Sequence, residues 1–272
     1  MPDIMANGLR FHVTDRGNGT PGMLLHGFPD TANLWESQIE ALVAAGYRAI
    51  APDMRGRGRS ERPPEVSDFA LPHCVADVAG IMDALDIERA HVIGHDWGAA
   101  VAWLFAMLRP ERVERLIAVS VGCPGAVTKP TLEGLQKGWY RLLIQFEDTA
   151  EELFQRDDWC LLRELLQWSP RADEYIATLS EPGALTAAFN WYRANLPPER
   201  LLGPGRPLPA VTAPTMGVFG AHDAYLTEQA MRMSERKVEG EWRYEHFNDA
   251  GHWLTLEEPE RFNALMLDFL GR

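Results

Sequence analysis

Asp96 lies at the centre of the stretch VIGHDWGAA (Val92–Ala100), between Gly94 and Gly98. A G-x-nucleophile-x-G turn between a strand and a helix exposes the side chain of its central residue, which elsewhere is a serine. A carboxylate is already ionised at neutral pH, so it can attack carbon without a base to remove a proton. Taken alone, the pattern fits a helix N-cap equally well, because aspartate is favoured at that position.

Two later residues, Asp223 and His252, complete a set that could activate water. The order nucleophile, acid, histidine is the chain order used with this type of turn, and both residues end stretches that resemble a strand and its loop (215–223 and 242–252). Such loops meet at the carboxyl edge of a parallel sheet, where α/β folds bind ligands. Asp249 is an alternative acid, but Asp223 is favoured because Asp249 lies on the loop of His252 itself.

An earlier motif, His26-Gly27-Phe28-Pro29, follows a short apolar stretch. The backbone N–H groups of Phe28 and Trp97 could pair there as an oxyanion hole, which stabilises the negative charge of a tetrahedral intermediate. The motif therefore adds a fourth element to the predicted site.

A metal centre is the competing interpretation of four residues: His222, His246, Asp249 and His252. Their spacing matches neither H-E-x-x-H nor a comparable set of ligands. The sequence therefore predicts no metal and no other cofactor.

The elements that must position these residues alternate between strand-like and helix-like stretches. Strands are predicted over 8–17, 22–27, 47–53, 90–95 and 115–121, helices over 34–46, 69–87 and 99–113, and further strands and a helix between 215 and 270. Such alternation is the signature of βαβ units. We therefore predict an α/β fold with a mainly parallel sheet flanked by helices.

Residues 125–207 have a different character, since they are charged, helical in period and rich in large aromatic residues. They end in a stretch with many prolines and glycines, which cannot continue a helix or a central strand. The sequence therefore predicts a core formed by 1–124 and 208–272, interrupted by a helical cap over 125–207.

The composition excludes several classes of protein. The 272 residues, 46% of them hydrophobic, suit one large globular domain or a domain with an insertion, and the net charge of −13 disfavours nucleic acid and anionic membranes as partners. Cys74, Cys123 and Cys160 suggest neither a disulfide framework nor a zinc site. Without a leader-like start or an apolar stretch of about 18 residues, we expect a cytoplasmic protein. A homodimer is compatible with the sequence, but no pattern supports one.

Five motifs together carry a family resemblance: HGFPD (26–30), PDMRGRGRS (52–60), GHDWGAA (94–100), GAHD (220–223) and AGHW (250–253). They resemble the epoxide hydrolase and haloalkane dehalogenase branch of the α/β-hydrolase superfamily, and the resemblance spans nearly the whole chain. It implies the α/β-hydrolase fold with a cap, and an aspartate that forms an alkyl ester with the substrate. Asp96 would be the nucleophile, His252 the base and Asp223 the residue that orients it.

The resemblance also implies tyrosines on the cap that donate to the epoxide oxygen. The segment FNWYRAN (189–195) resembles the N-W-Y-R segment of soluble epoxide hydrolases, which places one donor at Tyr192. The other would be Tyr140, with Tyr175 as the alternative. A protonated phenol can assist ring opening by about 10²- to 10⁴-fold. The competing role of these tyrosines is helix packing.

The expected substrate is a small apolar epoxide, which water converts to a vicinal diol. Trp97 stands where fluoroacetate dehalogenases place an arginine, which argues against an anionic substrate. The residues expected to bind the substrate are Phe28, Pro29, Trp97, Trp191 and Trp253.

Two other functions are weighed against this one. A haloalkane dehalogenase would use the same aspartate and could hold halide between Trp97 and one of Trp139, Trp159, Trp168 and Trp191. Phe28 lacks the side-chain donor of the dehalogenase subgroup that has asparagine there. A non-catalytic receptor on a hydrolase scaffold would bind a small molecule without turnover, because fold does not fix function.

Overall fold

An eight-stranded sheet organises the part of the chain that the computed structural model describes, residues 3–127, 129–167, 169–201 and 207–271. Its order is β1-β2-β4-β3-β5-β6-β7-β8. The strands are β1 (Asp3–Ala6), β2 (Leu9–Arg16), β3 (Pro21–Leu25), β4 (Arg48–Pro52), β5 (Ala90–His95), β6 (Val113–Val119), β7 (Thr215–Gly220) and β8 (Trp242–Phe247). All pairs from β4 to β8 are parallel, so the predicted α/β fold is confirmed.

The antiparallel end of the sheet contains a strand that the sequence analysis did not predict. β1 pairs with β2 across an Asn7-Gly8 turn, and both turn residues have positive φ. Asn-Gly is a strong signal for a two-residue hairpin, so this short dipeptide could have revealed β1.

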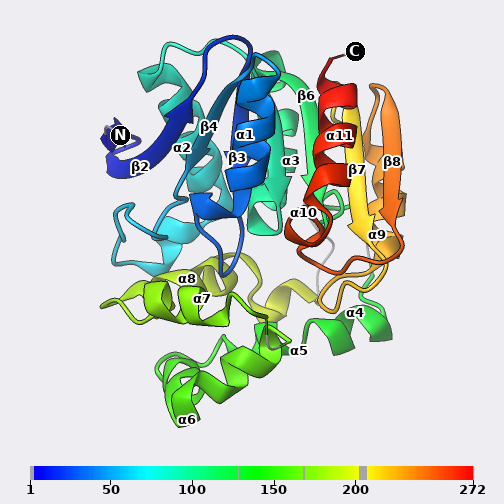
Figure 1. Cartoon of the computed structure of the whole chain (residues 1–272). Coiled ribbons are helices and arrows are strands. Elements are labelled where there is room, and N and C mark those ends of the chain that lie inside the picture. Colours follow the sequence, from blue (N-terminus) through cyan, green and yellow to red (C-terminus); the bar gives the residue numbers. More distant parts are fainter. Residues whose placement is uncertain (1–2, 128, 168, 202–206, 272) are drawn as a thin grey trace.

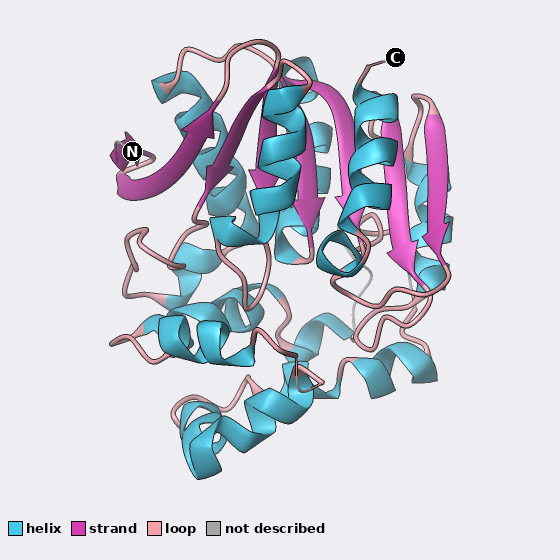
Figure 2. Ribbon diagram, viewed as in Figure 1, coloured by secondary structure: helices cyan, strands magenta, loops and turns pink. Residues whose placement is uncertain are grey.

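Two layers of helices cover the sheet (Figures 1 and 2). One face carries α1 (Glu36–Ala44), α10 (Leu254–Glu257) and α11 (Pro259–Leu270), and the other carries α2 (Leu71–Ala84), α3 (Trp97–Leu108) and α9 (Glu228–Met233). In the described ranges, short 3₁₀ helices complete the connections: η1 (Ala32–Trp35), η2 (Val66–Phe69), η3 (Pro110–Arg112), η4 (Pro198–Leu201) and η5 (Ser234–Lys237). Every residue of β5 is buried, as expected of a central parallel strand covered on both faces.

The segment between β6 and β7 forms a separate group of helices. These are α4 (Leu132–Lys137), α5 (Trp139–Leu143), α6 (Thr149–Leu165), α7 (Ala172–Leu179) and α8 (Ala184–Asn195). They lie beyond the carboxyl ends of the strands, at the bottom of Figure 1. We refer to these five helices as the cap, and we propose 125–207 as its extent.

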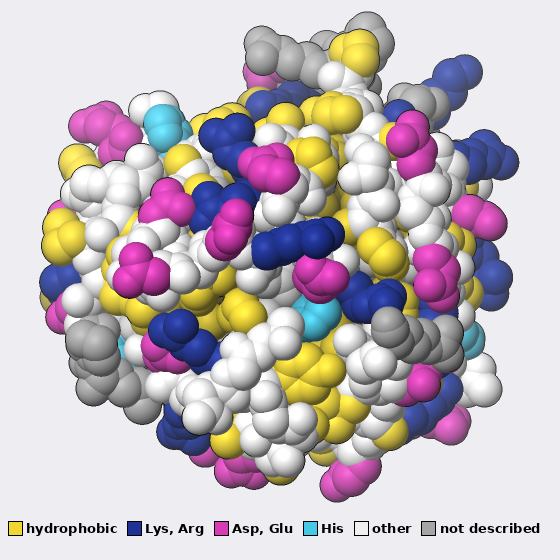
Figure 3. All heavy atoms as spheres, turned by 90° about the horizontal axis from the view of Figure 1, so that it is seen from above, with side chains coloured by type: hydrophobic (Ala, Val, Ile, Leu, Met, Phe, Trp, Pro, Cys, Tyr) yellow, Lys and Arg dark blue, Asp and Glu magenta, His cyan; other side chains and the backbone are white. Residues whose placement is uncertain are grey.

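The end of the molecule opposite the cap has a mixed surface. Lys and Arg side chains alternate there with Asp and Glu side chains (Figure 3). In the ranges that the structure describes, no helix has the length and hydropathy that crossing a membrane would need.

Candidate active site

Asp96 occupies a sharp turn between β5 and α3. Its φ of 51° and ψ of −121° are strained values for a residue other than glycine. The start of α3 packs closely against β3, since a Cβ atom at Gly98 would lie 1.9 Å from the carbonyl oxygen of Leu25. Only glycine therefore lets the start of α3 pass so close to β3, and this packing holds the carboxylate at the sheet edge.

The loop after β3 supplies a donor to this carboxylate. β3 pairs with β5 so that Leu25 lies opposite Gly94, which brings the following residues beside the turn. The backbone N–H of Phe28 donates to Asp96 Oδ1 at 2.8 Å, and a Cβ atom at Gly27 would lie 2.3 Å from the same oxygen. One predicted oxyanion donor thus contacts the carboxylate, while the role of the Trp97 N–H stays a prediction.

His252 and Asp223 meet beside Asp96, from the loops after β8 and β7. His252 Nδ1 lies 2.8 Å from Asp223 Oδ2, and His252 Nε2 lies 3.8 Å from Asp96 Oδ2. Both His252 and Asp223 are buried, whereas the alternative acid Asp249 is exposed. The structure therefore brings together the three residues that the sequence nominated, and favours Asp223 over Asp249.

Neighbouring charges shift the pKa values of His252 and Asp223. Burial alone would lower the pKa of His252, but the carboxylates of Asp223 and Asp96 raise it above its ordinary value. Burial would likewise raise the pKa of Asp223, but His252 and the N–H groups of Tyr225 and Leu226 lower it. The pair therefore favours an ionised Asp223 beside an imidazole of increased basicity.

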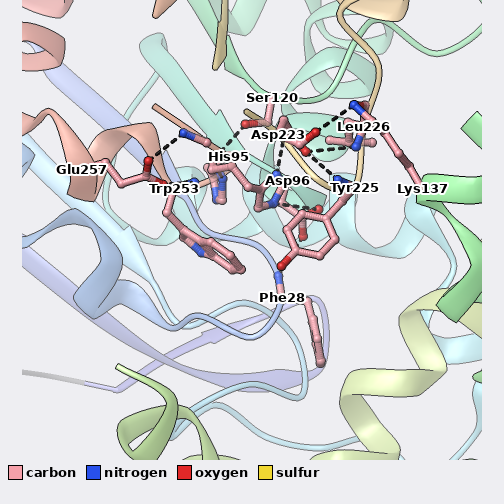
Figure 4. Close-up of polar contacts among 12 residues, drawn as sticks. Phe28, His95, Asp96, Ser120, Lys137, Asp223, Tyr225, Leu226, Trp253 and Glu257 are labelled. Carbon is pink, nitrogen blue, oxygen red and sulfur yellow. Dashed lines mark hydrogen bonds and ion pairs between the residues drawn. The ribbon is translucent and has the colours of Figure 1, made fainter. Parts of the chain in front are cut away.

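Further side chains, not anticipated from the sequence, hold the loop of His252 (Figure 4). His95 Nε2 lies 2.9 Å from the carbonyl oxygen of His252, and Ser120 Oγ donates to that oxygen at 3.1 Å. The Glu257 carboxylate accepts from the N–H groups of Gly251 and Trp253. His95 stands next to Asp96 in the motif, which was an available signal, but no local pattern pointed to Ser120 or Glu257.

A small pocket lies between the cap and the edge of the sheet that carries Asp96 and His252. We call the sheet edge its floor and the cap its roof. Its lining consists of Phe28, Asp96, Tyr140, Leu165, Leu166, Tyr192, Tyr225, His252 and Trp253. Leu165, Leu166 and Tyr225 are additions to the predicted site. Tyr225 lies two residues after Asp223, but nothing in its surroundings in the sequence distinguished it.

Tyr140 from α5 and Tyr192 from α8 approach each other in the roof of this pocket. Their ring centroids are 5.8 Å apart, and the ring of Tyr192 also meets those of Phe28 at 5.7 Å and Trp97 at 5.1 Å. Burial, together with the nearby Asp96, raises the pKa of both phenols. Both hydroxyl groups are therefore protonated at neutral pH and able to donate.

Tyr175, the alternative to Tyr140, has a different partner. Its hydroxyl donates to Asp30 Oδ1 at 2.9 Å, and Trp253 Nε1 donates to Asp30 Oδ2 at 2.9 Å. Asp30, the last residue of the HGFPD motif, thus joins the cap to the loop of His252. The structure places Tyr140, and not Tyr175, in the pocket with Asp96.

Four of the five predicted substrate-binding residues line at least one of two pockets. Phe28 and Trp253 line the pocket with Asp96, whereas Trp97 and Trp191 line an adjoining smaller one that also contacts Phe28. Pro29 is buried, follows a cis peptide bond and lines neither pocket.

The metal interpretation finds no support in the described ranges, where no group of three or more His, Cys, Asp or Glu side chains could hold an ion. His246 Nδ1 instead lies 2.9 Å from Asn248 Oδ1.

Comparisons with known proteins identify the family and the fold. The family model described as "alpha/beta hydrolase fold" matches residues 23–259. The AB hydrolase superfamily protein YfhM of Bacillus subtilis is 34% identical, with 98% of this chain and 96% of that protein covered. A protein of Caballeronia sordidicola named epoxide hydrolase is 30% identical, with 98% and 92% covered. A solved epoxide hydrolase variant from Bacillus megaterium superposes with a TM-score of 0.90 over 100% of both chains, and its 24% identity shows a shared fold.

Proposed function

The chain belongs to the alpha/beta hydrolase fold family, and we propose that within this family it is an epoxide hydrolase, which converts an epoxide and water to a vicinal diol. The relatives named epoxide hydrolase support this activity. The observation that carries the proposal is the pocket itself, where two protonated tyrosines, Tyr140 and Tyr192, face the same space as the carboxylate of Asp96. An epoxide needs both a nucleophile and a donor to its oxygen.

In the first step, Asp96 opens the epoxide ring. Oδ1 is held by the N–H of Phe28, so Oδ2 is the oxygen that attacks a ring carbon. The bond from that carbon to the ring oxygen breaks, and the oxygen takes a proton from Tyr140 or Tyr192. The products are an alkyl ester on Asp96 and a hydroxyl group on the neighbouring carbon.

In the second step, water cleaves the ester. His252 Nε2 removes a proton from water, and the oxygen attacks the Asp96 carboxyl carbon. The resulting negative charge lies on Oδ1, where the N–H of Phe28 already donates. The tetrahedral intermediate releases the diol, whose new hydroxyl takes the proton from His252. Asp96 retains one oxygen from water, and the second proton of that water restores the phenol that donated in the first step.

Halide binding would need Trp97 and a second tryptophan, and the described candidates for that second donor are poorly placed. Trp191 Nε1 already donates to the carbonyl oxygen of Arg55 at 3.1 Å, so it is occupied. Trp139 is 45% exposed, and Trp159, which is partly buried in α6, lines neither pocket. Trp168, the remaining candidate, lies outside the described residues.

The decisive experiment traps the ester. In His252→Gln, the ring still opens but water is not activated, so we expect the mass of the substrate to be added to the peptide that contains Asp96. A single turnover of the wild-type enzyme in H₂¹⁸O should then place ¹⁸O in the Asp96 side chain. Mass gain on another residue, or no label in Asp96, contradicts the mechanism.

The substrate class is tested separately, with styrene oxide and 1-bromobutane in parallel assays. We expect diol from the first and little bromide from the second. Bromide without diol would identify a dehalogenase, and binding without either product would identify a receptor.

A further inference from the structure

The loop that carries Asp223 is held by its own hydrogen bonds and by contacts from other parts of the molecule. Residues 221–227 connect β7 to α9. Within them lies the turn 223–226, where Asp223 Oδ1 accepts from the N–H groups of Tyr225 and Leu226 at 2.8 and 2.9 Å. These two bonds fix the carboxylate relative to its own turn. On the side of the core, the N–H of His222 donates to the carbonyl oxygen of Ala250 at 3.0 Å, which ties the start of this loop to the loop of His252.

Two cations of the cap bind the carbonyl groups of this turn. Lys137 Nζ, at the end of α4, donates to the carbonyl oxygens of Asp223 at 2.8 Å and Leu226 at 2.9 Å. Arg141, four residues later in α5, donates to that of Tyr225 at 3.1 Å. Figure 4 shows Lys137 reaching from its helix to the turn. Hydrogen bonds from charged donors are stronger than neutral ones, so these contacts restrain the turn.

Tyr225 makes a third connection to the cap. Its hydroxyl donates to the carbonyl oxygen of Leu165, the last residue of α6. Its ring meets that of His252 with a centroid distance of 4.9 Å and an interplanar angle of 72°. Movement of the turn would therefore displace both the acceptor of His252 Nδ1 and a ring packed against the imidazole.

We infer that Lys137 is a positioning residue, which, with Arg141, couples the cap to ester hydrolysis by holding the Asp223 turn against His252. This inference rests on the proposed function and extends it. The cap would act in both steps, through its tyrosines in ring opening and through its cations in the cleavage of the ester. Lys137 touches none of the reacting groups, whereas Arg141 also bonds the side chain of Tyr140, so of the two cations the test varies Lys137 alone.

The test separates the two steps in Lys137→Met. Rapid-quench mass spectrometry of the Asp96 peptide, with styrene oxide, gives the rate constants for ester formation and ester hydrolysis. We expect hydrolysis to slow by about 10- to 100-fold, as misplaced catalytic groups do, with formation changed by less than about threefold, so that the ester accumulates. Lys137→Arg keeps the donors and should restore most of the hydrolysis rate. Equal slowing of both steps, or no change in either, overturns the inference.

Glu133→Gln is the matched control. Lys137 also forms an ion pair with Glu133 at 3.3 Å, and the Glu133 side chain is 62% exposed. The control removes this ion pair but keeps the bonds from Lys137 to the turn, so we expect wild-type kinetics. If Glu133→Gln reproduces the effect of Lys137→Met, the ion pair and not the turn is responsible.

Two further measurements keep the inference testable if Lys137→Met does not fold or no ester forms. Tyr225→Phe removes the bond to Leu165 without touching a charge, and should also slow hydrolysis more than formation. The ¹H NMR signal of the proton between His252 Nδ1 and Asp223 should shift in Lys137→Met or Tyr225→Phe and stay unchanged in Glu133→Gln. A wild-type enzyme without ester on Asp96 contradicts the proposed function, whereas an NMR signal unaffected by these variants contradicts the positioning role.

Discussion

The floor and the roof of the pocket are built in different ways. In the floor, strand register and backbone contacts place the reactive groups: the N–H of Phe28 faces Asp96, and a glycine without a side chain separates Leu25 from the start of α3. In the roof, Tyr140 and Tyr192 are placed by contacts between aromatic rings from different helices.

Because of this difference, we expect the floor and the roof to tolerate substitution to different degrees. In the floor, backbone groups approach so closely that an added Cβ atom would clash, so we expect it to tolerate little substitution. In the proposed mechanism, the floor supplies the nucleophile and the groups that cleave the ester. Ring contacts at 5 to 6 Å tolerate changes in side chain more easily. The roof can therefore determine which leaving group is assisted and which substrate fits.

The largest effect should follow Asp223→Asn, in the floor. An amide can hold the wrong tautomer of His252, and this change in a related triad lowers turnover by about 10⁴-fold. Ester hydrolysis requires a neutral His252, so in the wild-type enzyme it is lost as pH falls through the raised pKa of this residue. Without the Asp223 charge, burial lowers that pKa, and the acid limb should move to lower pH.

Single-turnover decay of the ester between pH 5 and pH 9 measures both effects of Asp223→Asn, because the reference pKa of histidine, about 6.5, falls in this range. The comparison between floor and roof predicts that ester formation survives in this variant. An acid limb at unchanged pH would mean that another group is the base.

A smaller effect, on the opposite step, is expected in the roof. The double variant Tyr140→Phe, Tyr192→Phe removes both donors to the ring oxygen and should slow ester formation by about 10²- to 10⁴-fold. Hydrolysis of an ester once formed should continue at the wild-type rate. Pre-steady-state rates with styrene oxide measure the first step, and an unchanged rate would reduce these tyrosines to packing residues.

The floor could be predicted from the sequence because its geometry is local. Gly94, Asp96 and Gly98 lie within one turn, and the acid and histidine follow strands whose carboxyl ends meet in any parallel sheet. The alternation of strands and helices likewise predicted the sheet, although the four-residue β1 was too short for its periodicity to be recognised.

The roof could be predicted only in part. The local N-W-Y-R segment indicated Tyr192, but the choice between Tyr140 and Tyr175 depends on which helix faces the pocket, and that is a long-range property. The same reason applies to residues elsewhere in the site that could not be predicted: Tyr225, Ser120 and Lys137. Their partners lie between 27 and 132 residues away in the chain. Hydrogen bonds to backbone carbonyls leave no trace in the sequence of the acceptor.

A third prediction tests how rigid the floor is. In Gly27→Ala the added Cβ atom would lie 2.3 Å from Asp96 Oδ1, so the loop must shift and the N–H of Phe28 must move away. We expect turnover to fall by about 10²-fold, the scale of a lost oxyanion donor. Gly22→Ala, on the strand before this loop, would meet Leu42 Cδ1 at an ordinary 3.6 Å and is the control. Equal turnover in the two variants would show that the floor adapts.

The smallest kinetic effect is expected for Tyr175→Phe, which tests whether roof tyrosines act by chemistry or by packing. Tyr175 belongs to the cap, but its hydroxyl donates to the buried Asp30 and not into the pocket. Loss of the Tyr175 hydroxyl leaves Oδ1 of the buried Asp30 with one donor fewer, which should lower the free energy of unfolding by about 1–3 kcal/mol. Because Trp253 Nε1 still holds the other oxygen of Asp30, ester formation should change by less than about twofold. Urea unfolding and single-turnover rates measure the two quantities. If Tyr175→Phe slows ring opening as strongly as Tyr140→Phe, then the position of the cap, and not proton donation, limits that step.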